Sequence, residues 1–254
     1  MMPARLHVAA PPPMAGAELD LPEGAARHVQ VLRLQPGAGL TLFDGSGAEW
    51  SAEVLQMARS KVVVRLGERC EVDRELPIAV TLALGVPANE RMDTLVEKAT
   101  ELGVAAIQPL LCERSVLRLA GERAQKRREH WQAIAIAACE QSGRNRVPRI
   151  EPLATLASWL AALPTASAEP HEAERAARWL LSLDDDAAPL RSRRSDDAVP
   201  QRVIALSGPE GGLSDAEASA ARRHGFEPVS LGPRVLRADT APLALLACLG
   251  SDGG

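Results

Sequence analysis

The sequence VIALSGPEGGLSDAE, from Val203 to Glu217, combines a buried-strand pattern and a helix start in one short segment. The apolar run Val203–Leu206 predicts a strand. Ser214, followed three residues later by Glu217, predicts a capping box that begins a helix over Asp215–His224. The glycines of the intervening SGPEGG allow backbone N–H groups to approach a ligand closely, which suits a nucleotide-like ligand or an anion. A tight structural turn would produce the same pattern.

A second segment, SLGPRVLRADTAPLALL from Ser230 to Leu246, repeats the order of short strand, glycine loop and apolar helix. The loop carries Arg234 and Arg237 close to Asp239 and Thr240. Glycine loops at the carboxyl ends of two strands in an α/β sheet predict a ligand-binding crevice. A local ion pair between Arg237 and Asp239 is the alternative interpretation.

The glycines match neither of the common nucleotide-binding fingerprints. No Gly-Lys-Ser/Thr follows them, so a phosphate-binding nucleotide hydrolase of the P-loop type is disfavoured. The spacing GxGxxG is also missing, which disfavours the usual dinucleotide-binding site.

The rest of the chain predicts two domains, residues 1–72 and 73–254. Short alternating runs joined by turns indicate a compact β-barrel in the first, after a helix over Glu23–Leu32; the runs are Leu40–Phe43, Trp50–Leu55 and Lys61–Leu66. In the second domain, the strand Ile78–Leu84, a helix over Met92–Leu102 and the strand Ala106–Leu111 form a βαβ pattern typical of a parallel sheet.

Further along the chain, apolar periodicity predicts additional elements of this α/β domain. They are helices over Ala120–Ser142, over Ala154–Ala162 and from Thr240, and strands at Trp179–Leu183 and Val229–Leu231. The polar, proline-containing stretches 164–175 and 184–201 are predicted to be surface loops.

Composition narrows the class of protein. Apolar residues make up 46% of the 254, which is enough for a packed core. The start, MMPARLHVAAPPPMAG, has no long apolar region of the kind found in signal peptides, so a cytoplasmic location is expected. The four cysteines do not lie close together in the sequence, which predicts buried reduced thiols and no metal site.

The charge is unevenly distributed. The net charge of −4 by itself speaks against a nucleic-acid partner. Residues 113–149, however, contain nine basic and four acidic residues, a local net charge of +5. Aromatic residues are only 2% of the chain, so extended stacking of bases on the protein is not expected.

Read together, the glycine segments resemble the RsmE family of 16S (small-subunit) ribosomal RNA uridine-N3 methyltransferases, which belong to the SPOUT class. The resemblance extends over nearly the whole chain. It includes HVQVLRLQPGAGLTLFDGSG (His28–Gly47), RMDTLVEKATELGVAAIQPLLCERS (Arg91–Ser115) and WQAIAIAACEQSGRNRVPRI (Trp131–Ile150).

This resemblance implies an α/β fold in which a C-terminal SPOUT-type trefoil-knot domain follows an N-terminal PUA-like RNA-binding β-barrel. From the residues alone we would predict an open α/β sheet, because knotted chains are very rare. The family also implies a homodimer and S-adenosylmethionine as methyl donor, with no metal. The uridine should be unpaired or flipped out of its helix, because N3 lies on the pairing edge.

The resemblance also implies roles for individual residues. Arg237 is expected to stabilise charge on the uracil, and Glu210 or Asp239 to accept a proton or hold that arginine; the family usually has glutamate at position 239. The expected cofactor-binding residues are Leu206, Ser207, Gly208, Pro209, Gly211, Gly212, Leu231, Gly232, Leu236 and Thr240. The expected RNA-binding residues are Arg27, His28, Arg33, Arg114, Arg144, Asn145 and Arg146.

Two other functions remain compatible with the sequence. One is a related knotted methyltransferase that acts on another RNA. The other is an RNA-binding ribosome assembly factor without catalytic activity, which the aspartate at position 239 makes conceivable.

Overall fold

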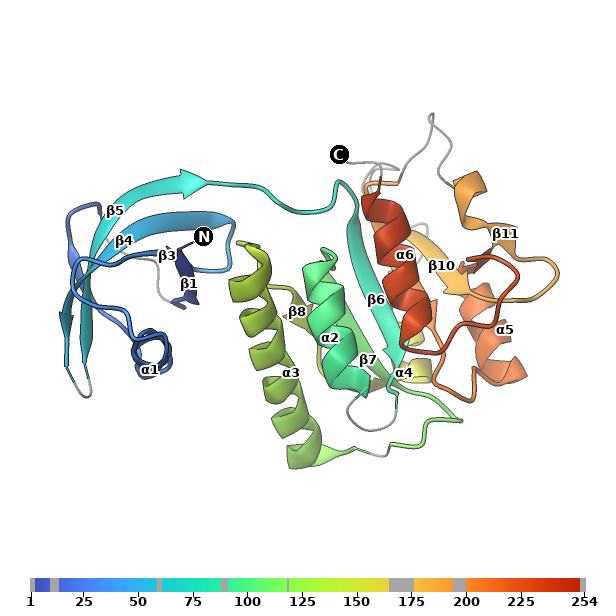
Figure 1. The fold of residues 1–254 in the computed structure, drawn as a ribbon. Helices are drawn as coiled ribbons and strands as arrows, with labels where there is room; N and C mark the ends of the chain where they lie inside the picture. The colour runs from blue at the N-terminus through green and yellow to red at the C-terminus, as the bar shows by residue number, and fades with distance from the viewer. Residues whose placement is uncertain are drawn as a thin grey trace. The chain divides into compact units, whose positions relative to one another are not determined.

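The computed structural model describes residues 3–9, 14–58, 61–87, 91–117, 119–164, 176–193 and 200–251. The chain forms two compact units (Figure 1). The first consists of Met1–Glu75 together with Ile136–Val147, and the second of Leu76–Ala135 together with Pro148–Gly254. The first unit therefore includes a segment from the middle of the chain, which local sequence patterns did not indicate.

The first unit contains a five-stranded sheet in the order β1-β3-β4-β5-β2. Its strands are β1 (Ala4–His7), β2 (Glu18–Asp20), β3 (Gly39–Phe43), β4 (Ala48–Met57) and β5 (Val62–Glu71). Burial alternates along β4, as the sequence pattern predicted, and the buried side chains pack with helix α1 (Glu23–Val31). The predicted turn between β3 and β4 is confirmed, with the Ser46 amide donating to Asp44 Oδ1 over 2.9 Å.

The second unit contains an eight-stranded sheet in the order β11-β13-β10-β12-β6-β7-β8, with β9 also paired to β7. All of its strand pairs are parallel. The strands are β6 (Ala79–Gly85), β7 (Ala106–Leu111), β8 (Arg149–Ile150), β9 (Ala154–Thr155), β10 (Ala177–Leu181), β11 (Ala188–Pro189), β12 (Arg202–Ser207) and β13 (Glu227–Ser230). The central strands are nearly continuous apolar runs because both faces of a parallel sheet are buried.

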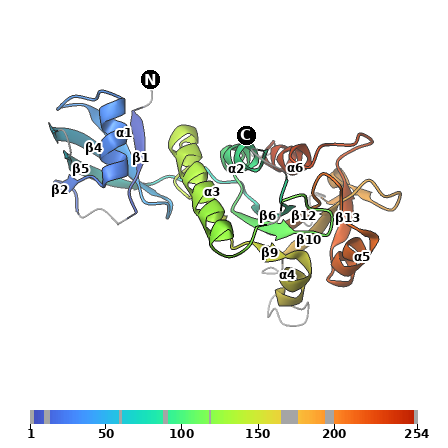
Figure 2. The same cartoon turned by 90° about the horizontal axis from the view of Figure 1, so that it is seen from below.

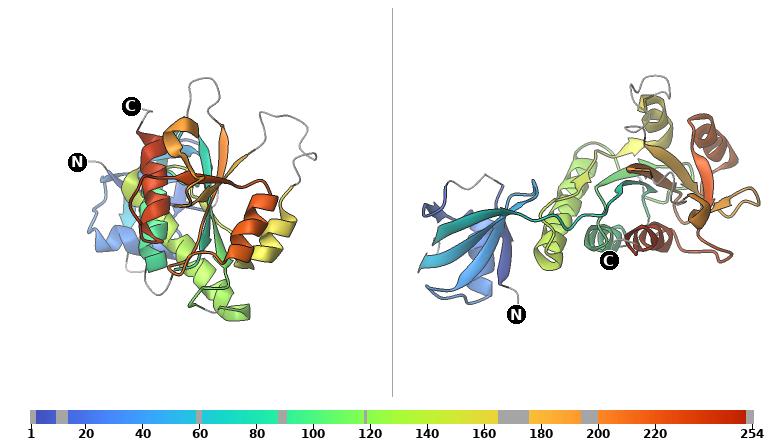
Figure 3. Two further views of the ribbon diagram at one scale, coloured as in Figure 1. Left: turned by 90° about the vertical axis from the view of Figure 1, so that its right-hand side faces the viewer. Right: turned by 90° about the horizontal axis from the view of Figure 1, so that it is seen from above.

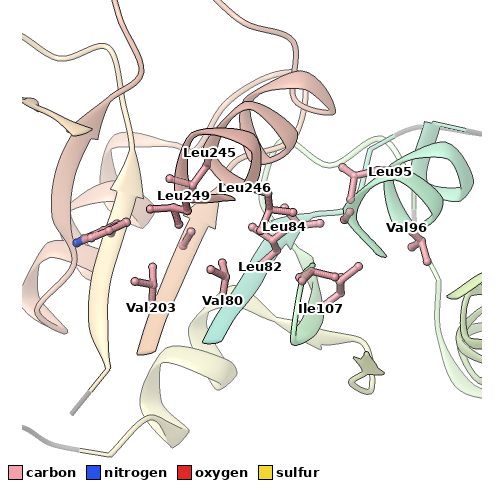
Figure 4. Packing of buried hydrophobic residues seen from close by; sticks show 14 of the residues in the cluster. Val80, Leu82, Leu84, Leu95, Val96, Ile107, Val203, Leu245, Leu246 and Leu249 are labelled. Atoms are coloured by element: carbon pink, nitrogen blue, oxygen red, sulfur yellow. The ribbon is translucent and has the colours of Figure 1, made fainter. Parts of the chain in front are cut away.

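Helices cover both faces of this sheet (Figures 2 and 3). On one face lie α2 (Arg91–Glu101), α6 (Thr240–Gly250) and part of α3 (Gly121–Ser142). On the other face lie α4 (Leu156–Ala162) and α5 (Asp215–Arg223). Figure 4 shows the first face, where β6 directs alternate side chains toward α2 and α6; the labelled residues of these three elements are Val80, Leu82, Leu84, Leu95, Val96, Leu245, Leu246 and Leu249.

Most predicted elements occur close to their predicted limits, and β7 matches its prediction at both ends. The very short strands, such as β1, β2, β8 and β11, were missed because a few residues carry too little periodicity. The predicted loop over 184–201 is partly wrong, since it includes β11 and the short 3-10 helix η2 (Leu190–Arg193), with Leu190 buried. Residues 165–175 and 194–199 of the two predicted loops lie outside the described residues. None of the described helices is long and apolar enough to cross a membrane.

Candidate active site

The candidate site lies in the second unit, at the point where successive connections between strands run in opposite directions across the sheet. In the sheet β10 lies between β12 and β13, and the chain passes from β12 through α5 to β13. Two loops leave the carboxyl ends of β12 and β13 and flank the end of β10. We call residues 207–213 the first glycine loop and residues 231–238 the second glycine loop. Ligands commonly bind at such a switch point of a parallel sheet.

A cleft of about 680 Å³ lies between these loops. Such a volume falls within the range of small-molecule binding sites. Its third wall is the end of β10 and the turn that follows, residues 180–184. The sequence predicted the two loops but not this wall, because the apolar strand β10 carries no glycine or charged motif. The other lining residues include Arg91, Asp215, Ala218, Val229 and Ala241.

The first glycine loop folds tightly on itself. A Cβ atom added at Gly208 would lie 2.9 Å from the backbone of both Gly212 and Leu213, so only glycine fits there. The amide of Gly212 donates to the carbonyl of Pro209 over 2.8 Å, which closes the turn. The loop then enters α5 through the predicted capping box, in which Ser214 accepts from the Glu217 amide and Glu217 accepts from the Ser214 amide. The glycines thus give this loop its tight conformation.

The second glycine loop has fewer internal contacts. The Ser230 hydroxyl contacts Gly232, accepting from its amide at 3.2 Å and lying 3.3 Å from its carbonyl oxygen. Gly232 itself has a φ of +114°, which side chains of other residues rarely tolerate. Arg237 is exposed and lines the cleft, while its carbonyl accepts hydrogen bonds from the first turn of α6. The loop therefore presents its guanidinium groups to the cleft and to solvent.

Asp239 lies at the start of α6 and does not line the cleft. Its Oδ1 is buried and has no hydrogen-bond partner among the described residues. Within the described part of the chain no ion pair joins it to Arg237, so the alternative interpretation of a local ion pair is wrong. A buried carboxylate oxygen without a hydrogen-bond partner is costly.

Glu210 lies in the first glycine loop and faces the cleft together with Arg91, the first residue of α2. The distance between Arg91 Nη1 and Glu210 Oε1 is 3.4 Å. Both side chains are partly exposed, so the ion pair contributes little to stability but orients the carboxylate. Arg91 was not predicted as a site residue, although it begins one of the matching motifs.

The turn after β10 is held by α5. Arg222 Nη1 donates to Asp186 Oδ2 over 2.6 Å, and Arg222 Nη2 donates to Asp184 Oδ2 over 3.0 Å. The hydrogen bond from Arg222 lowers the pKa of Asp186, and the same pairing raises the pKa of Arg222. Because Asp184 lines the cleft, Arg222 fixes the third wall from outside.

Most of the predicted cofactor-binding residues lie together at the cleft. Those that line it are Ser207, Gly208, Pro209, Gly212, Leu231, Gly232 and Leu236. Leu206, Gly211 and Thr240 do not line it; Leu206 is fully buried in the core beneath the loop. Of the predicted catalytic residues, Glu210 and Arg237 line the cleft.

The predicted RNA-binding residues have different environments. In the first unit, Arg27 and Arg33 are exposed, and Arg33 has an unusual positive φ of 54°. His28 Nδ1 lies 3.3 Å from Glu140 Oε2. Arg146 Nη1 donates to the carbonyl of Ser46 over 2.7 Å. In the second unit, Arg114 donates to two carbonyls of the first glycine loop.

Arg144 and Asn145 are buried, with 3% and 1% of their surface exposed, so a direct RNA contact does not fit their positions. Arg144 forms an ion pair with Glu75, and the Asn145 amide donates to Glu49 and to the carbonyl of Val72. These contacts attach the segment Ile136–Val147 to β4 and to the residues that follow β5.

The Glu49 carboxylate is central to this attachment. Burial alone would raise the pKa of Glu49, but hydrogen bonds from Arg74, Arg5 and Asn145 lower it to about 2. Arg144 and Asn145 of the matched WQAIAIAACEQSGRNRVPRI segment thus form their hydrogen bonds inside the first unit, which the local sequence could not reveal.

The prediction of four buried thiols is only half correct. Cys112 and Cys139 are buried, and burial raises the pKa of the first to about 12 and of the second to about 11. Such thiols are unreactive at neutral pH. Cys70, near the end of β5, and Cys248, in α6, are exposed.

Comparison with known proteins defines the class. Residues 74–250 match the family model of the RNA methyltransferase domain, and residues 21–67 match that of the RNA methyltransferase PUA domain. The protein is therefore a member of the RNA methyltransferases that carry a PUA domain, and the predicted fold class is confirmed as an α/β methyltransferase domain with an N-terminal PUA domain.

Individual relatives narrow this class. The ribosomal RNA small subunit methyltransferase E of Synechocystis sp. is 35% identical over 94% of this chain and 75% of its own length. The enzyme of that name from Neisseria gonorrhoeae, solved bound to S-adenosyl methionine, is 34% identical, with a TM-score of 0.86 over 97% of this chain and 96% of its own. A protein from Legionella pneumophila, solved with the bound cofactor SAM, is 33% identical, with a TM-score of 0.88 over 99% of this chain and 98% of its own. The chain belongs to the ribosomal RNA small subunit methyltransferase E family.

Proposed function

We propose that this protein transfers the methyl group of S-adenosylmethionine to N3 of a specific uridine in 16S (small-subunit) ribosomal RNA. The observation that carries the proposal is the cleft between the two glycine loops at the switch point of the parallel sheet, in a chain that belongs to an RNA methyltransferase family. Relatives with S-adenosylmethionine bound support the choice of cofactor. The choice of N3 of uridine rests on the family resemblance of the motifs.

The cleft suits S-adenosylmethionine in shape and charge. Apolar side chains from the third wall and the second glycine loop, Leu180, Leu231 and Leu236, can cover the faces of an adenine ring. Backbone groups of the two loops can bind its polar edge. The cofactor also carries a positively charged sulfonium and an ammonium group, and the carboxylates of Asp184, Glu210 and Asp215 line the cleft. The residues present therefore fit the cofactor.

When bound, the cofactor supplies an activated methyl group that leaves a neutral thioether, so the chain itself need only position and deprotonate the acceptor. In this role Arg237 donates hydrogen bonds to the uracil oxygens, where negative charge develops as N3 loses its proton. The proton acceptor is Glu210 or Asp239. Glu210 lines the cleft and is oriented by Arg91, whereas Asp239 lies behind the second glycine loop. We therefore assign proton transfer to Glu210 and a positioning role to Asp239.

The RNA substrate is held mainly through its charge and shape. Arg27 and Arg33 in the first unit are exposed and suited to phosphate contacts. In the same unit His28 is partly exposed and Arg146 is exposed. Because each phosphate contact releases counterions, binding should weaken steeply with salt. The target uridine must be unpaired or flipped to present N3 to the cleft. We also propose a cytoplasmic location, because the proposed substrate is a ribosomal particle. The homodimer and the knot remain predictions from the family resemblance.

The decisive experiment is methyl transfer from labelled S-adenosylmethionine to isolated small ribosomal subunits and to naked 16S RNA, followed by mass-spectrometric mapping of the product. A single N3-methyluridine in small-subunit RNA is expected. Label in transfer RNA or large-subunit RNA alone would instead support a related methyltransferase. Comparison of the two substrates shows whether the assembled particle is required.

Calorimetry with S-adenosylmethionine distinguishes the enzyme from an RNA-binding assembly factor that lacks catalysis. The enzyme should bind the cofactor without RNA, and a cofactor-free RNA-binding protein should show no heat of binding. No feature of the cleft favours the second function, because its walls retain the glycine loops and Arg237.

A further inference from the structure

The turn that follows β7 lies against the first glycine loop, although nearly one hundred residues separate them in the sequence. The turn is closed locally, since the Ser115 hydroxyl accepts from the Cys112 amide over 3.0 Å and the Ser115 amide donates to the Cys112 carbonyl over 3.1 Å. Ser115 is buried, with 5% of its surface exposed. The turn is thus a fixed support from which Glu113 and Arg114 extend toward the loop.

Arg114 contacts the loop in two ways. Its Nη1 donates to the carbonyl of Gly211 over 3.1 Å and to the carbonyl of Leu213 over 3.2 Å. Its stem also packs against the loop, because a Cβ atom added at Gly211 would lie 3.0 Å from the Arg114 Cβ. The guanidinium therefore bridges two carbonyls at the end of the loop.

Glu217 makes a second connection between the same segments. One carboxylate oxygen accepts from the Ser214 amide over 3.0 Å and completes the capping box of α5. The other accepts from the amide of Glu113 over 2.8 Å. A residue expected only to begin a helix therefore also joins that helix to the turn after β7.

These contacts matter because the first glycine loop has few of its own. Within the described chain its one internal backbone hydrogen bond outside strand pairing joins Gly212 to Pro209. A glycine-rich segment loses much conformational entropy when it is ordered, so external contacts must hold it in one conformation. The arginine and the glutamate supply them on either side of Leu213.

We propose that Arg114 and Glu217 are positioning residues that hold the first glycine loop in the conformation that binds S-adenosylmethionine. Arg114 thereby acts on cofactor affinity rather than as a simple RNA ligand. The inference rests on the proposed function, because the ligand of the loop is taken to be S-adenosylmethionine. It predicts that loss of either side chain weakens cofactor binding more than it slows the chemical step.

The test measures the affinity for S-adenosylmethionine by calorimetry, the affinity for 16S RNA by filter binding, and methyl transfer at saturating cofactor. The variants are Arg114→Ala, Arg114→Lys and Glu217→Gln. Lysine keeps the charge but not the planar guanidinium, and glutamine offers one acceptor oxygen where glutamate offers two. Arg127→Ala is the matched control, since Arg127 is an exposed arginine of the same basic stretch.

Arg114→Ala should raise the Kd for S-adenosylmethionine about tenfold, the effect of losing a charged hydrogen-bonding group. Arg114→Lys should also raise the Kd, because a lysine lacks the planar guanidinium that bridges the two carbonyls. Glu217→Gln should raise it less. The kcat at saturating cofactor should stay within about twofold of wild type, which marks a loss of binding rather than of catalysis. RNA affinity should fall no more in Arg114→Ala than in Arg127→Ala.

Two results would overturn the inference. One is unchanged cofactor affinity in Arg114→Ala with a loss of RNA affinity that exceeds the control, which would make Arg114 an RNA ligand. The other is full cofactor affinity in Arg114→Lys, which would mean that charge alone is sufficient. If the wild-type protein bound no S-adenosylmethionine, the proposed function would fail instead. Hydrogen exchange of the loop amides tests, without ligand, whether Arg114 holds the loop. The exchange rate should increase in Arg114→Ala, and an unchanged rate would refute the positioning role.

Discussion

The two glycine loops that form the cleft have similar sequences and similar places in the fold, but the surrounding structure holds them differently. The first loop is fixed by a tight approach at Gly208, by the capping box of α5 and by contacts from Arg114. The second is held through Ser230 and the first turn of α6, and it leaves Val235 84% exposed. The comparison suggests a division of work. The rigid wall holds the cofactor site in one conformation and carries Glu210, whereas the more accessible wall covers the adenine with Leu231 and Leu236 and presents Arg237 to the RNA base.

The largest expected effect is on the accessible wall. Replacement Arg237→Ala should lower methyl transfer roughly one hundred- to one thousand-fold, because a donor to the developing charge is lost. Affinity for S-adenosylmethionine should change little, as measured by calorimetry. Arg223→Ala, which removes an exposed arginine from the last turn of α5, is the control. Near-normal turnover of Arg237→Ala would refute the role assigned to the second loop.

A substitution in the rigid wall should have the opposite pattern. Gly208→Ala places a Cβ atom against the backbone of the loop. Such overpacking destabilises the native conformation by about 1–3 kcal/mol. The Kd for S-adenosylmethionine should increase correspondingly, while the kcat at saturating cofactor falls less. Gly24→Ala, where nothing lies near the added Cβ, serves as control. Equal losses in kcat and in affinity would argue against the division of work.

The third wall should give a smaller effect. Arg222→Ala releases Asp184 and Asp186 from α5, but these ion pairs are largely exposed and screened by solvent, so each contributes little to stability. The affinity for S-adenosylmethionine should fall about three- to fivefold by calorimetry at low salt, and less at high salt. The adjacent Arg223→Ala tests whether loss of any positive charge on α5 has the same consequence.

The smallest effect is expected from Ser230→Ala, which removes the hydroxyl contacts with Gly232 at the base of the second loop. Such a hydrogen bond contributes about 1 kcal/mol when buried and less at a partly exposed position. Methyl transfer to the RNA should decrease about twofold, with cofactor affinity unchanged. A decrease as large as that of Arg237→Ala would show that the second loop also needs a rigid conformation.

Much of the fold followed from local patterns. Apolar runs predicted the central strands β6, β7 and β12, and the capping box predicted the start of α5, because these signals involve residues a few positions apart. The shortest strands could not be predicted from the sequence. A strand of two residues is defined by its pairing with a neighbouring strand, because so short a segment has no pattern of its own.

The candidate site was predicted in part for the same reason. The glycine loops have a local signature, and Glu210 and Arg237 within them line the cleft. The third wall, with Leu180 and Asp184, and the contribution of Arg91 depend on the strand order, in which β10 lies between β12 and β13. The order of strands in a sheet brings together segments that are far apart in the chain. The pattern of apolar residues in one strand does not encode that order.

The sequence by itself determined the family, the two glycine loops and the residue types available for chemistry. Only the tertiary structure decided what several arginines do. Arg144 and Arg114 belong to the same basic stretch, yet the first forms an ion pair with Glu75 inside the first unit and the second supports a loop of the cleft. Arg237 remains exposed. The physical reason is that a guanidinium binds whichever acceptors the fold brings within reach, and burial and long-range contacts are properties of the folded chain.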